Sequence, residues 1–191
     1  MVRSAELPGN PIGQKKVCVV DTGYDITHED LPKASDGVAG YTPVDYSPEV
    51  WSSDGHGHGT HCAGTIGAIG NNAVGVTSVN PDPSKFSFFI GKGLTDSGSG
   101  STSSVLEAVD ACRDNGADVI SMSLGGGGPS TIANDLYESV YADNVLLIAA
   151  AGNDVSHHAS SLLVEMHVMY HDFSLFSALT HFDHPLNSKF S

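Results

Sequence analysis

Three histidines stand within six positions in segment 55–64, GHGHGTHCAG: they are His56, His58 and His61. Imidazole nitrogens serve both as zinc ligands and as general bases near neutral pH. The spacing H-x-H-x-x-H is typical of a two-metal hydrolase, although such sites normally place an Asp ligand where this chain has Thr60. In the alternative interpretation, one histidine transfers protons and the glycines shape the start of a helix.

Two further polar residues follow apolar runs that are typical of buried strands. Residues 17–21 read VCVVD and end in Asp21-Thr-Gly, and residues 145–150 lead into Ala-Gly-Asn153. Sites in open parallel sheets form at the carboxyl ends of strands, so Asp21 can meet a histidine that opens a later helix. A buried carboxylate fixes the imidazole tautomer and stabilises its protonated form. The sequence therefore predicts an Asp21–His58 pair suited to nucleophilic catalysis.

The elements that must position this pair alternate along the chain. Strands that alternate with helices predict an α/β fold, with a parallel sheet and helices on both faces. The apolar patterns predict strands at 17–21, 85–91, 118–122 and 145–150 and helices at 58–69, 103–116 and 131–142.

The segment 103–116 carries the strongest helix signals. Ser104 and Glu107 have the spacing of a capping box, in which each side chain satisfies a free amide. Asn115-Gly116 predicts a left-handed end. The face expected to be buried consists of Val105, Val109 and Cys112.

Composition limits the class of protein. The 191 residues, 40% of them apolar, are enough for one domain with a sizeable core. Twenty-two acidic against eight basic residues give a formal charge of −14, which argues against nucleic acid or an anionic membrane as partner. The first 16 residues contain no apolar signal-peptide region, and no apolar run reaches the ~20 residues of a membrane span. We expect a soluble chain.

The three cysteines, Cys18, Cys62 and Cys112, show no CxxC spacing. Because their number is odd, at least one is free unless it pairs between chains. We expect each of them to be a small buried apolar residue, since free cysteine is among the most buried residue types.

Four segments resemble the successive signature blocks of the subtilisin-like serine proteases. They are VVDTGYDITHEDL, DGHGHGTHCAGT, ISMSLGGG and IAAAGN, in the family's order over residues 15–154. The cysteine after HGTH is similar to the proteinase K-like branch. The resemblance implies a three-layer subtilisin-like fold, a monomeric endopeptidase acting on peptides or proteins, and a secreted protein. It covers the N-terminal two-thirds of the family's catalytic domain.

The resemblance also implies roles for single residues. Asp21 would be the triad carboxylate and His58 the general base and acid. Asn153 would donate its amide to the oxyanion, His61 would be structural, and His56 would be a loop residue without a required role.

Two segments resemble the strands between which an extended peptide binds by β-addition. They would pair with the backbone of the substrate and line the pocket beside the scissile bond. These substrate-binding residues are Ser99, Gly100 and Ser101 on one side and Ser123, Leu124 and Gly125 on the other.

A structural calcium site is implied in the same way, because carboxylate, amide and carbonyl oxygens are the ligands that Ca²⁺ prefers. The matching residues are Asp30, Asn72 and the carbonyls of Gly70, Val74 and Val76. No organic cofactor is implied.

The nucleophile of the family lies in a G-T-S-M-A segment, and the printed sequence contains no G-T-S-M. All 22 glycines lie at or before Gly152, and the composition changes after Asn153. We therefore expect an N-terminal extension (1–14), a partial, C-terminally truncated peptidase domain (15–154) and an unrelated, disordered or misfolded tail (155–191). A chain with only these residues would be inactive. The alternatives are a non-catalytic peptide-binding pseudoenzyme and a zinc hydrolase using His56, His58 and His61.

Overall fold

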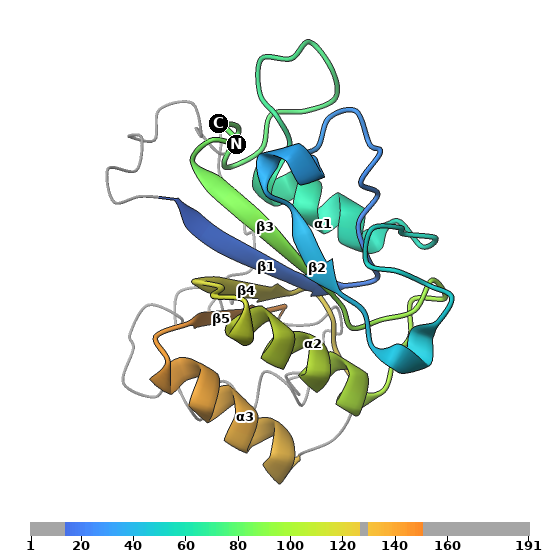
Figure 1. Cartoon of the computed structure of the whole chain (residues 1–191), viewed down its shortest axis with the longest axis vertical. Coiled ribbons are helices and arrows are strands. Elements are labelled where there is room, and N and C mark those ends of the chain that lie inside the picture. Colours follow the sequence, from blue (N-terminus) through green and yellow to red (C-terminus); the bar gives the residue numbers. More distant parts are fainter. Residues whose placement is uncertain (1–13, 127–129, 151–191) are drawn as a thin grey trace, which may run out of the picture.

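A computed structural model describes residues 14–126 and 130–150. Its centre is a five-stranded, all-parallel sheet with the strand order β2-β3-β1-β4-β5 (Figure 1). The strands are β1 (Lys15–Asp21), β2 (Ala39–Tyr41), β3 (Phe86–Lys92), β4 (Val119–Met122) and β5 (Leu146–Ala149), and the α-helices are α1 (His58–Gly67), α2 (Thr102–Asp114) and α3 (Thr131–Ala142).

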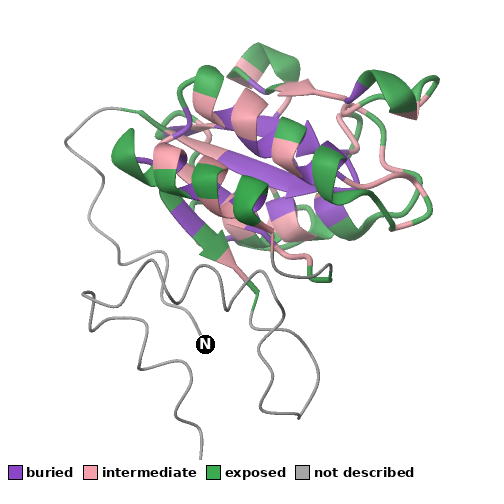
Figure 2. Cartoon of the chain, turned by 90° about the horizontal axis from the view of Figure 1, so that it is seen from below, coloured by how far each residue is buried: buried purple, intermediate pink, exposed green. Residues whose placement is uncertain are grey.

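The central strand β1 shows why both faces of the sheet carry helices. Its side chains alternate between the faces, so that Cys18 and Val20 enter one apolar cluster and Val19 enters another. The first cluster also contains residues of α2 and α3, and the second contains Ala63 of α1. Figure 2 shows the buried residues along the strands and the exposed residues on the outer sides of the helices. The expected α/β fold with helices on both faces is confirmed.

Small residues allow α1 to lie close to the sheet. A Cβ atom on Gly67 would come within 2.4 Å of the Phe86 ring and 2.8 Å of the Phe88 ring. Real Cβ atoms do not approach so closely, so the helix could not keep this position with a larger residue. The small-residue composition of segment 58–67 thus fixes the depth of the helix that begins at His58.

The buried face and the C-terminal end predicted for α2 are confirmed, but the predicted N-cap is not. Val105, Val109 and Cys112 are buried, and Gly116 has a φ of 73° just beyond the end of the helix. However, the helix begins one residue before the predicted range, and the Ser101 hydroxyl accepts the Ser104 N–H at 3.1 Å. The expected capping box at Ser104 and Glu107 was wrong, because several serines compete in segment 101–104 and the first of them takes the cap.

The stretch between Thr22 and Gly55 holds more structure than its turn signals predict. The short strand β2 pairs with β3, and two 3₁₀ helices lie at Ala34–Asp36 and Val44–Tyr46. None of them carries an apolar period long enough to be recognised. Within the described residues, no helix is long and apolar enough to cross a membrane.

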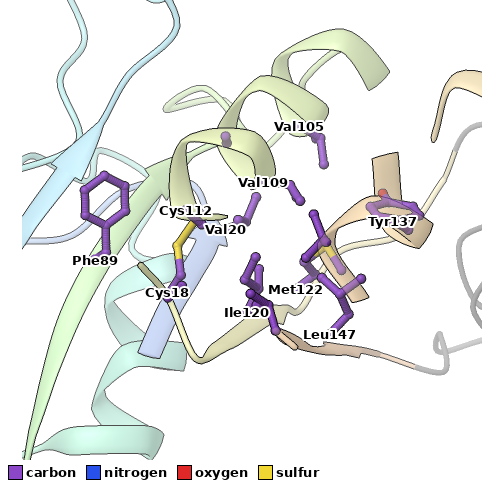
Figure 3. Close-up of a cluster of buried hydrophobic side chains, with 14 of the residues drawn as sticks. Cys18, Val20, Phe89, Val105, Val109, Cys112, Ile120, Met122, Tyr137 and Leu147 are labelled. Atoms are coloured by element: carbon purple, nitrogen blue, oxygen red, sulfur yellow. A yellow bond between two sulfur atoms is a disulfide. The ribbon is translucent and has the colours of Figure 1, made fainter. Parts of the chain in front are cut away.

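A disulfide joins the sheet to α2, between Cys18 on β1 and Cys112 (Figure 3). The two residues are 94 positions apart, and their Cα atoms lie 5.9 Å apart. Cys62 is free, in agreement with the odd number of cysteines. The expected burial is confirmed for Cys18 and Cys112, whereas Cys62 is only partly buried. The sequence left the pairing open, because strand and helix spacings do not reveal which buried thiols face each other.

Candidate active site

The order of the strands places a crevice at the carboxyl end of β1. The chain enters β3 from α1 on one face and leaves it for α2 on the other, and β1 lies between β3 and β4. Ligand sites of open α/β sheets form at such a change of direction. Asp21 is the last residue of β1. The topology therefore brings this carboxylate to the place where a site is expected.

Asp21 and His58 form a close pair. The Asp21 side chain is fully buried, and its Oδ1 lies 2.7 Å from His58 Nδ1. The Thr22 N–H also donates to this oxygen, at 2.7 Å. A carboxylate oxygen only accepts hydrogen bonds, so Nδ1 carries the proton and Nε2 is left with a free lone pair. His58 is 42% exposed, so this nitrogen can receive a proton from a bound molecule.

The N-terminus of α1 is held by a carboxylate that precedes it. Gly57 adopts a φ of 89° and offers no side-chain cap. Asp54 accepts the Gly57 N–H at 2.8 Å, the Thr60 N–H at 2.9 Å and the Thr60 hydroxyl at 2.6 Å. Burial raises the pKa of Asp54, but these bonds together outweigh it and hold the pKa below its ordinary value. The ionised carboxylate also suits the positive end of the helix dipole.

Thr22 connects this cap to the end of β1. Its hydroxyl donates to Asp54 Oδ1 at 2.8 Å and accepts the Gly59 N–H at 2.9 Å. A Cβ on Gly59 would lie 2.3 Å from the Gly23 carbonyl oxygen, so only glycine allows this approach. Thr22 and Asp54 thus fix His58 relative to Asp21. We missed both residues from the sequence, although an acidic residue just before a helix is a recognisable signal.

The three histidines do not converge on one point. Among the described residues, a single group of His, Cys, Asp or Glu side chains brings three ligand atoms within 4.8 Å of one another, and it consists of Asp21, His58 and Cys62. His61 is exposed and lines a separate cavity beside α1. His56 lies close to His58, with 6.2 Å between the ring centroids, and lines the same cleft. The arrangement of the three histidines therefore does not support a zinc site formed by all of them.

Cys62 lies against the imidazole of His58. Its Sγ is 3.9 Å from both ring nitrogens. Burial raises the pKa of the Cys62 thiol, so it is protonated at neutral pH and is not a ready thiolate ligand. A sulfur equidistant from the two nitrogens does not lie along the lone pair of Nε2, so we read the contact as one of packing.

A cleft of about 430 Å³ is lined by His58 and by the two segments expected to bind substrate. Residues 99–101 lie on one side and 123–125 follow directly from β4 on the other. Residues 99–101 form no strand, and Ser101 instead caps α2. The apolar part of the lining consists of Leu94, Val105, Leu124, Ala133 and Tyr137. The cleft can take an extended chain with apolar side chains.

Asp30 is almost fully buried beside the loop after α1. It accepts Val76 N–H and Asn72 Nδ2–H, each at 2.8 Å, and these bonds hold its pKa below the ordinary value. Within the described residues, no lysine or arginine forms an ion pair with it. A buried carboxylate that none of the described lysines or arginines neutralises is the kind of oxygen ligand that a hard cation prefers. The amide oxygen of Asn72 accepts the Val74 N–H. To bind a cation next to Asp30, this amide would have to rotate so that its oxygen faces the carboxylate.

Asn153 and the tail 155–191 lie outside the described residues, as does the N-terminal segment up to residue 13. Their expected roles therefore stay predictions.

Comparison with known proteins agrees with this geometry. Residues 13–171 match the Subtilase family, peptidase S8. Subtilisin DY of Bacillus licheniformis is 40% identical over 141 residues, covering 74% of this chain and 48% of the relative. The minor extracellular protease Epr of Bacillus subtilis (strain 168) is 37% identical over 139 residues, covering 73% of this chain and 20% of the relative.

Among solved structures, the psychrophilic subtilisin-like protease Apa1 of the Antarctic psychrotroph Pseudoalteromonas sp. AS-11 aligns with a TM-score of 0.70 at 37% identity. The alignment covers 82% of this chain and 35% of that protein, and the chain spans less than half the length of each of these three relatives. The sheet order, the family match and these relatives together make the chain a member of the Subtilase family.

Proposed function

We propose that the described residues form the base-bearing half of a serine endopeptidase that cleaves extended peptides. The observation that carries the proposal is the 2.7 Å contact between Asp21 and His58, whose imidazole lines the cleft. A base with a free Nε2 beside a peptide-sized groove is the arrangement that acyl transfer requires.

In the proposed reaction, His58 Nε2 takes the proton of a serine hydroxyl while the serine oxygen bonds to the scissile carbonyl carbon. Asp21 stabilises the resulting imidazolium, and the Asn153 amide donates to the oxyanion. His58 then returns the proton to the leaving nitrogen as the C–N bond breaks. A water molecule then attacks the acyl-enzyme while His58 takes its proton, and His58 returns that proton to the serine oxygen as the peptide acid is released.

The serine has no counterpart in the printed sequence, which contains no G-T-S-M segment. We therefore propose that a polypeptide with only these residues does not hydrolyse peptides by itself. The cysteine that follows His61 supports placing the chain near the proteinase K-like branch. Secretion is part of the same proposal, since one relative is named an extracellular protease. The proposal also includes a monomeric state.

A chimera tests the proposed function. Residues 14–150 of this chain would be joined to the C-terminal half of subtilisin DY, and hydrolysis of a chromogenic tetrapeptide anilide would be measured. We expect hydrolysis by the chimera and none by the printed chain. A folded chimera that shows no activity, judged by circular dichroism, would contradict the assignment.

The cleft also supports a second function, peptide binding without cleavage. It is formed by the described residues, to none of which the nucleophile is assigned. Saturable binding of a labelled tetrapeptide to the printed chain, with no cleavage over hours, would favour this pseudoenzyme. The absence of binding would remove it.

We also propose a structural calcium ion held by Asp30, Asn72 and the carbonyls of Gly70, Val74 and Val76. The ion would offset the buried charge of Asp30 and hold the loop 70–76 in place, without taking part in catalysis.

Calcium at about 100 times its dissociation constant should then stabilise the chain by about 2.7 kcal/mol, which corresponds to a rise in Tm of about 5–10 °C. Thermal unfolding with EDTA and with added Ca²⁺ measures the difference. Asp30→Asn should abolish it, whereas Asp82→Asn, at an exposed carboxylate, should leave it intact. An identical Tm in EDTA and Ca²⁺ would eliminate the site.

A further inference from the structure

Lys92 is the one fully buried cation among the described residues. It ends β3 and stands opposite Asp21 in the register of β1 and β3. A buried ammonium is strongly destabilising unless its N–H groups are all partnered. Here the partners are the Thr22 carbonyl, Asp96 Oδ1 at 2.6 Å and Glu49 Oε2 at 3.3 Å. The ammonium thus donates hydrogen bonds to two of these oxygens and forms an ion pair with the third, and the three oxygens come from three separate segments.

The first partner belongs to the turn that carries the catalytic carboxylate. Thr22 is the residue whose N–H bonds Asp21 and whose hydroxyl holds the N-terminus of α1. The next residue, Gly23, has a φ of 124°, and a Cβ there would lie 2.3 Å from the Ser53 carbonyl oxygen. The backbone is therefore closely packed around the ammonium. A change in the Lys92 bond to Thr22 shifts the donors that fix Asp21 and His58.

The second and third partners belong to the wall of the cleft. Asp96 lies in the turn that leads to Ser99, where Thr95 N–H donates to the Ser99 carbonyl at 2.8 Å. Glu49 Oε2 accepts the Asp96 N–H at 2.8 Å, so both carboxylates hold the same turn. Lys92 is the main cause that holds the pKa of Asp96 below its ordinary value. Without the ammonium, these two anions would lie close together with no cation between them.

We propose that Lys92 is a positioning residue that couples the peptide-binding wall at 96–101 to the Asp21–His58 pair. When a peptide binds and shifts this wall, Asp96 moves and pulls on the Lys92 ammonium. The ammonium in turn moves the Thr22 carbonyl, and with it the Thr22 groups that donate to Asp21 and hold the N-terminus of α1. The peptide arm of this coupling rests on the proposed function. A long apolar side chain in place of Lys92 would fill the same space but lose both hydrogen bonds and the ion pair with Glu49.

The test uses the printed chain and compares Lys92→Met with Lys15→Met. Lys15 forms an exposed ion pair with Asp118 at the opposite end of β1, so its loss controls for the removal of a lysine charge. Two quantities are measured: the NMR resonance of the proton between His58 Nδ1 and Asp21, and the Kd of a labelled Ala-Ala-Ala-Leu peptide. In Lys92→Met, we expect the resonance to move or broaden and the Kd to rise at least about fivefold. Lys15→Met should change neither.

An unchanged His58 resonance in a folded Lys92→Met chain would overturn the proposal, because a purely structural lysine predicts that result. If Lys92→Met does not fold, Asp96→Asn replaces it. This variant leaves Lys92 with Glu49 and Thr22, and it should change both quantities in the same direction by less. A wild-type chain that does not bind the peptide would contradict the proposed function, and the His58 resonance alone would then decide about Lys92.

Discussion

In the active chimera described above, His58→Ala is expected to lower turnover about 10⁶-fold, which is the size of the loss that the same change causes in subtilisin itself. Without the imidazole, no group takes the proton of the serine hydroxyl as it attacks. Asp21→Asn should lower turnover about 10⁴-fold, because an amide nitrogen facing Nδ1 favours the wrong tautomer. Initial rates with a tetrapeptide anilide measure both losses.

The matched control is His56→Ala, two positions away and in the same cleft. Its ring packs 6.2 Å from that of His58 without a bond to Asp21, so we expect activity to stay within about tenfold of the parent. A loss as large as that of His58→Ala would show that the assignment of a single general base is wrong. The histidines would then have to act together, and bound metal would have to be measured.

Reduction of the Cys18–Cys112 disulfide is expected to lower the free energy of unfolding by about 4 kcal/mol. The reason is that a cross-link between residues 94 positions apart removes many conformations from the unfolded chain. For a chain of this size the loss corresponds to about 10 °C in Tm. Thermal unfolding with and without a reductant measures it.

Alkylation checks the pairing independently. In denaturant without reductant, iodoacetamide should modify only Cys62, and after reduction it should modify all three cysteines. Cys62→Ser should keep the sensitivity to reductant, whereas Cys112→Ser should lose it. Three reactive thiols before reduction would contradict the disulfide.

The long elements of the fold could be predicted because their signals are local. The range 131–142 is the observed α3, and the predicted strands end within about two residues of the observed ones. The strand β2 was missed because three residues with a central glycine, Gly40, carry no period. Its strand conformation comes from pairing with β3, and its central residue is a glycine because the Trp51 ring leaves no room for a Cβ there.

In the candidate site, too, some contacts could be predicted from local sequence signals and others could not. The proximity of Asp21 and His58 follows from a strand end, a helix start and the rule for parallel sheets. The roles of Thr22, Asp54 and Lys92 do not follow, because each depends on a hydrogen bond between segments at least 32 positions apart or on burial that the residue type does not reveal. Lysine is almost never fully buried, so sequence reasoning places Lys92 on the surface.

The position of β1 in the sheet has a consequence for how the chain folds. Its partners are β3, 71 positions further on at Lys15–Phe86, and β4, 102 positions further on at Val17–Val119. Strands this far apart in sequence can pair only after a large loop has closed. The conformational entropy lost in closing the loop precedes any stabilising contact, so such pairings slow folding. During synthesis, the apolar VCVV segment of β1 therefore has no partner strand until β3 has been made about 71 positions later, and it lacks its second partner β4 until 102 positions later. Chaperone demand should concentrate on this interval.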